Sequence, residues 1–329
     1  MNGIASVPII DVSPLRDGTG GAGVAAQVDA ACRDTGFFYV VGHGIPLSVQ
    51  ARVDAAARDF FALDDEEKAA IAMANGGRAW RGWFPLGGEL TSGRPDMKEG
   101  LYFGEELPPG DPRPLHGPNQ FPARPAELRA AVLDYIGALT ALGHLVLQAM
   151  AVGLGLDAGW FAEHLTARPT VLFRIFRYPP LQSADDRWSV GEHTDYGLVT
   201  LLGQDASGGL EVRGPDGWIA APPVPDSFVV NLGDMLERMT GGRYRSTPHR
   251  VRNVYGVERL SFPLFLDPGW DAEVRPVPGM EVDVTGAGDS ADRWDGASVH
   301  DWSGTYGDYL LAKVGRVFPA LRDEVLGGA

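Results

Sequence analysis

The sequence contains a single cysteine, Cys32, among its 329 residues. One thiol excludes an internal disulfide and any metal site built from several thiolates, and it fits a reducing compartment such as the cytoplasm. The first residues lack the basic region and long apolar run of a signal peptide, and the longest apolar stretches are too short and too interrupted to span a bilayer. We therefore expect a cytoplasmic protein that does not bind a membrane.

Positive charge is also scarce, because 28 Lys and Arg stand against 43 Asp and Glu, which gives a formal net charge of −15. Nucleic acids and anionic lipids are bound by clustered basic side chains, so neither is an expected partner. Hydrophobic residues make up 44% of the chain, which is enough apolar material for a large core. We expect a small molecule as the partner, and a monomer or weak homo-oligomer as the assembly.

The pattern of apolar runs divides the chain into four segments that we expect to form one structural unit. Residues 1–125 predict strands and helices followed by a long irregular stretch rich in Gly and Pro, and residues 126–167 hold a helix of strong three-to-four periodicity and a connection. Residues 168–275 predict an antiparallel barrel or sandwich, and residues 276–329 a tail with a helix. The runs expected to form strands are 7–11, 36–41, 171–178, 198–203, 210–213, 228–232, 249–253 and 259–266.

The motif His193-x-Asp195 is the first candidate functional feature. Side chains at positions i and i+2 of a strand point to the same face, so the imidazole and the carboxylate would converge. A third ligand must come from elsewhere, and His249 opens a later apolar run. Two histidines and one carboxylate leave three coordination positions open, which is the arrangement of non-haem Fe(II) oxygenases. The alternative is that His193 and Asp195 form a hydrogen-bonded pair in a loop.

The second feature is Arg259-x-Ser261, where period-2 alternation places both residues on one face together with Pro263 and Phe265. An arginine that faces a barrel interior needs an anion, because burial of an unpaired guanidinium is costly. The distal carboxylate of 2-oxoglutarate could accept two parallel hydrogen bonds from the guanidinium and a third from the serine hydroxyl. The alternative is that Arg259 lies on the outer face, paired with Glu258 or solvent.

With these residues in place, the sequence resembles the isopenicillin N synthase-like family of Fe(II)/2-oxoglutarate-dependent dioxygenases over nearly its whole length. The resemblance implies a mainly β fold with flanking helices, in which an N-terminal α/β region wraps a double-stranded β-helix (jelly-roll) core. It also implies that His193, Asp195 and His249 bind Fe(II), and that Arg259 and Ser261 bind 2-oxoglutarate. The segments that carry the resemblance are 7–11, 36–46, 177–180, 193–197, 231–234, 246–251 and 259–262.

The resemblance implies further that Tyr178 hydrogen-bonds the co-substrate, although Phe176 stands where many plant relatives have asparagine. It implies an enzyme that uses O2 to hydroxylate, desaturate or cyclise a small metabolite, with release of succinate and CO2. A natural-product intermediate or an amino-acid derivative is the expected substrate. Two alternatives remain, an Fe(II) oxidase of the same fold that does not use 2-oxoglutarate, and a non-catalytic binding or sensor jelly-roll.

Residues that share a strand face with Tyr178 are candidates for substrate binding. Period 2 places Arg174 and Phe176 on this face, so Arg174 would be a second interior cation that pairs with a polar or anionic group of the substrate. The alternative is an internal salt bridge between Arg174 and a nearby carboxylate. Phe176 and Phe265 would supply apolar walls. Three aromatic residues of the Gly- and Pro-rich stretch are also expected near the pocket: Trp83, Tyr102 and Phe103.

Overall fold

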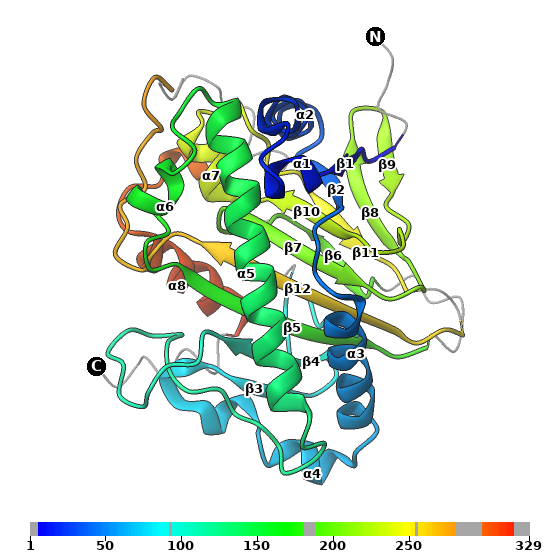
Figure 1. The fold of residues 1–329 in the computed structure, drawn as a ribbon. Helices are drawn as coiled ribbons and strands as arrows, with labels where there is room; N and C mark the ends of the chain where they lie inside the picture. Colours follow the sequence, from blue (N-terminus) through cyan, green and yellow to red (C-terminus); the bar gives the residue numbers. More distant parts are fainter. Residues whose placement is uncertain (1–5, 92–93, 181–187, 254–255, 281–297, 319–329) are drawn as a thin grey trace.

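The computed structural model describes residues 6–91, 94–180, 188–253, 256–280 and 298–318. Their strands form a sheet of eight strands, in the order β1-β2-β10-β7-β12-β5-β4-β3, and a sheet of four, in the order β6-β11-β8-β9 (Figure 1). This pair of sheets confirms the expected jelly-roll core. The strands are β1 Ile9–Asp11, β2 Phe37–Val41, β3 Gly82–Phe84, β4 Glu99–Gly104, β5 Thr170–Tyr178, β6 Val190–His193, β7 Val199–Gln204, β8 Leu210–Gly214, β9 Gly217–Ala220, β10 Phe228–Leu232, β11 His249–Val251 and β12 Arg259–Asp267.

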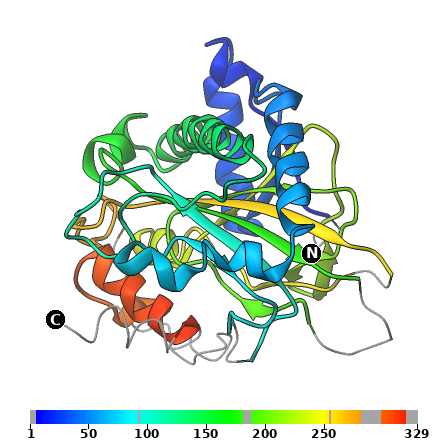
Figure 2. The same cartoon turned by 90° about the horizontal axis from the view of Figure 1, so that it is seen from below.

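Helices flank the larger sheet on both faces. Figure 2 shows α3 and α5 on one side of it and α8 on the other. The N-terminal α/β region is joined to the barrel through β2, which pairs with β1 in parallel and with β10 in antiparallel orientation. The helices are α1 Ser13–Arg16, α2 Gly21–Asp34, α3 Leu47–Phe61, α4 Asp65–Ala69, α5 Leu128–Gly153, α6 Trp160–His164, α7 Asp234–Met239 and α8 Tyr306–Val317, with 3-10 turns η1 Met73–Ala79 and η3 Val299–Asp301.

β5 and β12 are long neighbouring strands of the larger sheet; β5 is rich in β-branched and aromatic residues, and β12 in leucine and phenylalanine. They pair in antiparallel orientation, with Arg259 opposite Tyr178 and Ser261 opposite Phe176. This register brings the inner faces of the two strands together, because directly opposite residues point to the same side of a sheet. The core of the site is therefore built on regular paired strands.

Two strands lie where the sequence predicts only an irregular stretch. β3 and β4 pair with each other, and β4 adds to the edge of β5, which places Tyr102 opposite Arg174. The surrounding residues are rich in Gly and Pro and carry little local strand signal, so the pairing with β5 supplies the stability that local propensity does not. The prediction of a long loop was wrong at these two strands, and Tyr102 is a strand residue.

Helix α5 lies across the outer face of the larger sheet and contacts α2, α3, β7 and β12. Contrary to the expectation from the sequence, it is long and apolar enough to cross a membrane by length and composition alone. Half of its most apolar window is buried inside the protein, as in the core helix of a globular domain. Its buried residues recur at the three-to-four spacing that the sequence shows.

Two glycines of α5 provide a matched test of this packing. A Cβ at Gly143 would lie 2.7 Å from Leu266 Cδ2 and 3.2 Å from Leu201 Cδ1, whereas a Cβ at Gly137 would meet no described atom within 4 Å. We expect Gly143→Ala to lower the free energy of unfolding by about 1–3 kcal/mol, because overpacking pushes the helix from the sheet. Gly137→Ala should raise it by roughly 0.5–1 kcal/mol, because alanine is the better helix former. Urea unfolding measures both, and shifts of the same sign would contradict the packing.

Helix α8 closes the inner side of the larger sheet. The hydroxyl of Tyr306 donates to Asp267 at the end of β12, and the hydroxyl of Tyr309 donates to Asp234 Oδ2 at 2.7 Å. Both carboxylates are buried, so these bonds fix the helix at two points. The apolar side of α8 then faces the space between the sheets, through Leu310, Val314, Val317 and Phe318, the last of which directly follows the helix.

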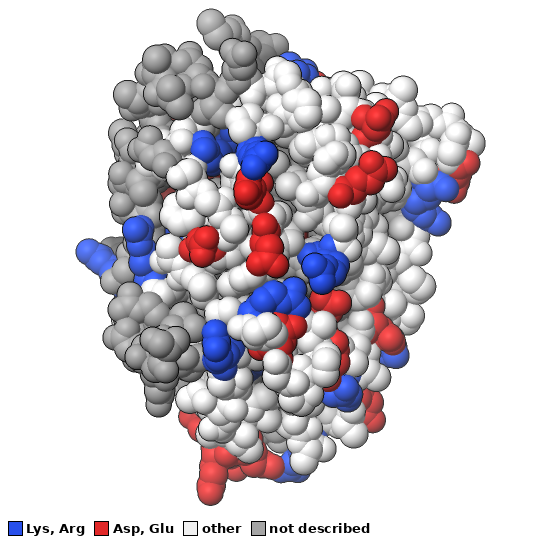
Figure 3. Space-filling view, turned by 90° about the vertical axis from the view of Figure 1, so that its left-hand side faces the viewer, with Lys and Arg blue, Asp and Glu red and all other residues white. Residues whose placement is uncertain are grey.

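The surface carries charges of both signs. On the face shown in Figure 3, basic side chains alternate with acidic ones. The described part of this face has no continuous basic tract of the kind that phosphate backbones require.

Candidate active site

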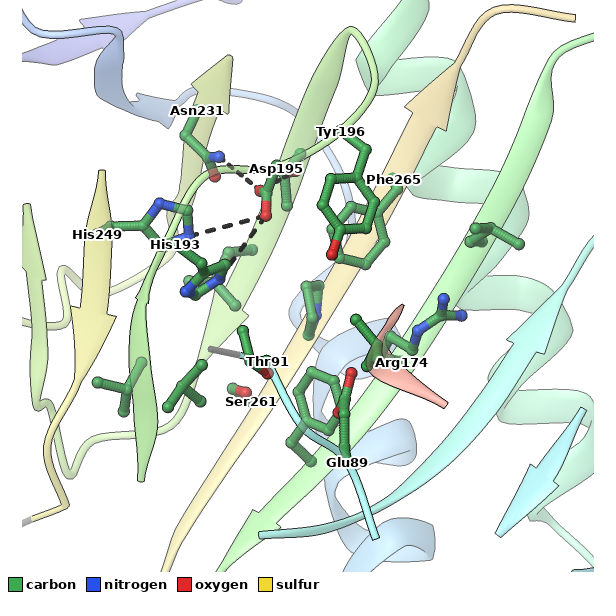
Figure 4. A pocket seen from close by; sticks show the side chains of 18 of the residues that line it. Glu89, Thr91, Arg174, His193, Asp195, Tyr196, Asn231, His249, Ser261 and Phe265 are labelled. Atoms are coloured by element: carbon green, nitrogen blue, oxygen red, sulfur yellow. Dashed lines mark hydrogen bonds and ion pairs between the residues drawn. The ribbon is translucent and has the colours of Figure 1, made fainter. Parts of the chain in front are cut away.

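A cavity of about 140 Å³ lies between the two sheets. Its walls come from both sheets, from α8 and from the segment that precedes β4. Figure 4 shows His193, Asp195 and His249 on one side of the cavity, and Glu89, Thr91 and Arg174 on the other. The cavity therefore has a histidine-rich end and a charged end, which we describe in turn.

His193 and His249 face each other across two paired strands. They are direct partners in the register of β6 and β11, and their ring centroids lie 4.2 Å apart. The Nδ1 atom of His193 lies 2.8 Å from the carbonyl oxygen of Gly191, and that of His249 lies 3.2 Å from the carbonyl of Thr247. Each Nδ1 therefore carries the proton and donates, which leaves the Nε2 lone pair of each ring available to a metal.

Asp195 completes the set from the turn that follows β6. Its Oδ1 atom lies 3.9 Å from His193 Nε2 and 3.8 Å from His249 Nε2. The backbone of Asp195 forms a bridge to Gly233, and the amide of Asp234 donates to the Asp195 carbonyl at 2.8 Å. A Cβ at Gly233 would lie 2.4 Å from the carbonyl oxygen of Gly197, so only glycine allows the two backbones to approach this closely.

The second carboxylate oxygen of Asp195 is held by two side chains. Oδ2 accepts hydrogen bonds from Thr200 Oγ1 at 2.5 Å and from Asn231 Nδ2 at 2.6 Å. Oδ1 is thereby aimed at the two imidazoles, in the way that outer partners orient metal ligands. Thr200 and Asn231 were not singled out from the sequence, although Asn231 lies in one of the segments that carry the family resemblance.

The protonation states suit a divalent cation. Burial lowers the pKa of His193 to about 4, so its imidazole is neutral near pH 7. Burial works to raise the pKa of Asp195, but His249, His193 and the bonds from Thr200 and Asn231 hold it below its ordinary value. The three ligand atoms lie within 4.8 Å of one another. Two imidazoles and one carboxylate on one side of a cavity fit the donor set of non-haem Fe(II).

Arg259 is a buried cation in the same cavity. Its side chain is 1% exposed, and none of its three guanidinium nitrogens has a hydrogen-bond partner among the described residues. Glu258, the partner considered from the sequence, pairs instead with Arg177 at 2.7 Å and with Arg58 at 3.5 Å. Such burial without an anion is costly, so the geometry calls for an anionic ligand at this position.

Ser261 and Tyr178 lie beside Arg259. The Tyr178 hydroxyl is 3.3 Å from Ser261 Oγ, and the Arg259 guanidinium carbon is 4.8 Å from the centroid of the Tyr178 ring. The three residues offer a planar cation and two hydroxyl groups at one place in the cavity. This set matches a carboxylate, which accepts several hydrogen bonds in a plane.

Arg174 points into the opposite end of the cavity. Its guanidinium carbon lies 3.4 Å from the centroid of the Tyr102 ring and 5.6 Å from that of Phe265. No carboxylate among the described residues lies within the 4.0 Å of an ion pair. The alternative of an internal salt bridge is therefore wrong for the described part of the chain. Phe176 also lines the cavity, beneath the ammonium of Lys98, whose Nζ is 4.4 Å from the ring centroid.

Sequence reasoning missed a polar cluster at this end. Lys98 is 2% exposed and lies 3.0 Å from Glu89 Oε2 and 2.9 Å from Asp96 Oδ2, while its ammonium donates to Thr91 Oγ1 at 3.2 Å. The four residues lie in a Gly- and Pro-rich segment whose pattern gives no sign of burial. Asp267, at the end of β12, could have been found, because it continues the period-2 face of Arg259, Ser261, Pro263 and Phe265.

Two of the aromatic residues expected near the cavity do not line it. The indole nitrogen of Trp83 donates to Glu99 at 2.9 Å, and Phe103 packs against Phe121 and Phe173 in the core. Adjacent residues of a strand point to opposite faces, so Phe103 points outward because Tyr102 points inward. Of the three residues, Tyr102 lines the cavity, whereas Trp83 and Phe103 do not.

Comparison with known proteins agrees with this geometry. Residues 7–124 match the profile of the N-terminal region of a non-haem dioxygenase in morphine synthesis, and residues 169–268 match that of the 2OG-Fe(II) oxygenase superfamily. The chain is 44% identical to a probable iron/ascorbate oxidoreductase of Dictyostelium discoideum, over 92% of this chain and 91% of that protein.

Solved structures with the same fold cover nearly the whole chain. One is a full-length protein of Neurospora crassa in complex with alpha-KG and 5-formyluracil, with a TM-score of 0.78 and 28% identity over 97% of this chain and 98% of that one. Another is an assigned member of the 2OG-Fe(II) oxygenase family from Caulobacter crescentus, with a TM-score of 0.79 and 29% identity over 95% and 100% of the two chains.

Proposed function

Because this chain belongs to the 2OG-Fe(II) oxygenase superfamily, which oxidises small molecules with Fe(II), 2-oxoglutarate and O2, we propose a role for each polar group of its cavity. His193, Asp195 and His249 hold the iron through Nε2, Oδ1 and Nε2. Arg259 and Ser261 hold the distal carboxylate of 2-oxoglutarate. The iron and this co-substrate supply O2 activation, with succinate and CO2 as co-products.

The main support for 2-oxoglutarate as the co-substrate is the guanidinium of Arg259, which has no hydrogen-bond partner within the described part of the chain. A buried cation without an anion, in the same cavity as two histidines and an aspartate, is explained by an anionic co-substrate that reaches the metal. Tyr178 adds a hydroxyl beside Ser261 and stacks under the guanidinium, so it orients the carboxylate.

The prime substrate binds at the opposite end. Arg174 presents its guanidinium to the cavity between Tyr102 and Phe265, and we propose that it binds an anionic group of a small metabolite, such as a natural-product intermediate. Phe176 and Phe265 form apolar walls between this anchor and the triad. A substrate anchored at Arg174 thereby presents its remaining carbon atoms to the metal.

An anaerobic titration tests the co-substrate assignment. Addition of Fe(II) and 2-oxoglutarate should produce the weak visible absorption band of an iron-chelated keto acid, with one equivalent of each bound. A flat difference spectrum would favour a sensor that does not chelate the keto acid. Succinate formation coupled to O2 uptake then separates the proposed reaction from that of an Fe(II) oxidase which takes all electrons from its substrate or from ascorbate.

A further inference from the structure

Tyr102 lies between two opposite charges at the substrate end of the cavity. Arg174 rests on one face of its ring, with the guanidinium carbon 3.4 Å from the centroid. The Tyr102 hydroxyl donates to Glu89 Oε1 at 2.5 Å. The carboxylate and the guanidinium thus lie on neighbouring parts of one side chain, yet these two described residues form no ion pair within 4.0 Å. Figure 4 shows both groups beside the cavity.

Glu89 belongs to a cluster that keeps one negative charge. The single ammonium of Lys98 lies between the carboxylates of Glu89 and Asp96, so one of the two negative charges is not compensated within the cluster. Lys98 Nζ also donates to Thr91 Oγ1 and lies within ion-pair distance of both carboxylates, so its single positive charge is shared between Glu89 and Asp96. Glu89 Oε2 is buried and, although Lys98 Nζ is 3.0 Å away, has no partner in hydrogen-bond geometry among the described residues.

The substrate end therefore has one positive pole, Arg174, and one negative pole, Glu89. Asp267 also lines the cavity, but burial raises its pKa to about 7, it accepts a hydrogen bond from Tyr306, and it forms no ion pair with Arg174 within 4.0 Å. A ligand with only a carboxylate would compensate Arg174 but would lie close to the negative cluster, and a ligand with only an amine would do the reverse. A zwitterion with neighbouring charges compensates both poles, and buried charges are tolerated only when they are paired. The aromatic walls of Phe176 and Phe265 then contact the apolar part of the same molecule.

We propose that the substrate is an α-amino acid or another small zwitterion with adjacent ammonium and carboxylate groups. The carboxylate binds Arg174, and the ammonium binds Glu89 Oε2. The inference rests on the proposed function, because it names the chemical class of the substrate for that same site. Glu89, which the sequence pattern did not reveal, becomes a residue that determines specificity.

Calorimetric titration without turnover tests the inference. The protein is loaded with Fe(II) and 2-oxoglutarate under argon and titrated with each of the common L-amino acids. The tightest binder is then compared with the acid that lacks its amino group and the amine that lacks its carboxylate. We expect the amino acid to bind at least about tenfold more tightly than either analogue. The inference is overturned if the acid binds as tightly, or if no amino acid binds with a Kd below about 10 mM.

Variants of Glu89 and Arg174 test which group of the ligand each residue binds. Glu89→Gln keeps an acceptor for Tyr102 and should raise the Kd of the amino acid about tenfold while leaving that of the acid unchanged. Arg174→Gln should weaken both ligands. Glu105→Gln, at an exposed residue just beyond β4, is the matched control and should change neither. An unchanged amino-acid preference in Glu89→Gln would overturn the role of Glu89.

The same samples separate this inference from the proposed function. Binding of 2-oxoglutarate is titrated first in each variant. If the unmodified protein did not bind 2-oxoglutarate, the proposed function would be contradicted. If it bound 2-oxoglutarate but showed no preference for zwitterions, only the proposed substrate class would be overturned.

Discussion

Replacement of His193 or Asp195 by alanine is expected to abolish 2-oxoglutarate turnover and tight Fe(II) binding. Each substitution removes one of three atoms that converge within 4.8 Å and leaves a set that cannot hold the iron in place. Loss of an outer partner typically lowers metal affinity or activity by roughly 10- to 100-fold, so loss of a ligand should exceed about 100-fold. Succinate release and the Fe(II) dissociation constant measure the two effects.

A histidine outside the cavity provides the control. His164 is exposed at the end of α6, and its Nδ1 lies 2.9 Å from the carbonyl oxygen of Trp160. His164→Ala should retain both Fe(II) binding and turnover. If His193→Ala also kept the iron affinity of the unmodified protein, the metal would have to be held elsewhere and the assigned ligand set would be refuted.

Arg259→Ala should raise the concentration of 2-oxoglutarate for half-maximal turnover by roughly 100-fold or more. Removal of one partner from a buried ion pair costs about 3–5 kcal/mol, and each 1.4 kcal/mol corresponds to about a tenfold change in affinity. Affinity for Fe(II) in the absence of 2-oxoglutarate should stay within a few-fold, because Arg259 is not a metal ligand. Steady-state kinetics with 2-oxoglutarate as the varied component gives the answer.

The stability of a second variant at this position gives a readout independent of activity. Without a ligand, the buried guanidinium has no hydrogen-bond partner in the described part of the chain, so Arg259→Met should unfold at the same temperature as the unmodified protein or at a higher one. Saturating 2-oxoglutarate should raise the unfolding temperature of the unmodified protein far more than that of the variant. Arg213→Ala, at an exposed residue of β8, is the control. An equal rise in the Arg259 variant would show that the carboxylate binds elsewhere.

The β-barrel and the inward faces of β5 and β12 were predictable, because they depend on the alternation of side chains along each strand. Period-2 alternation on β5 and β12 placed Arg174, Tyr178, Arg259 and Ser261 inside, and the cavity contains all four. Where β-branched and aromatic runs end at turns, the strand boundaries were predicted closely: β10 has the expected bounds, and β5 begins one residue earlier than expected. The convergence of His193 and Asp195 was expected from a shared strand, but β6 ends at His193, and Asp195 is held in place by Gly233 and Asn231 from a distant part of the chain.

The substrate end was not predictable from local pattern. Glu89 and Lys98 lie in a Gly- and Pro-rich segment whose sequence predicts a solvent-exposed loop. They are buried because β4 pairs with the edge of β5. The burial of Lys98 is tolerated because its ammonium lies between the carboxylates of Glu89 and Asp96, which is a relation in space that has no fixed sequence spacing. Contacts of this kind follow from tertiary structure alone.

The direct pairing of His193 with His249 across β6 and β11 limits how this chain can change in length. A point substitution elsewhere in either strand leaves the two imidazoles opposite each other. The pairing already holds one irregularity, because β6 runs one residue further from Val190 to His193 than β11 does from Val251 to His249. A further insertion or deletion beside either histidine would turn one ring to the outer face, because side chains alternate with every residue. We therefore expect functional homologues to tolerate sequence divergence in these strands while their lengths around the two histidines stay fixed.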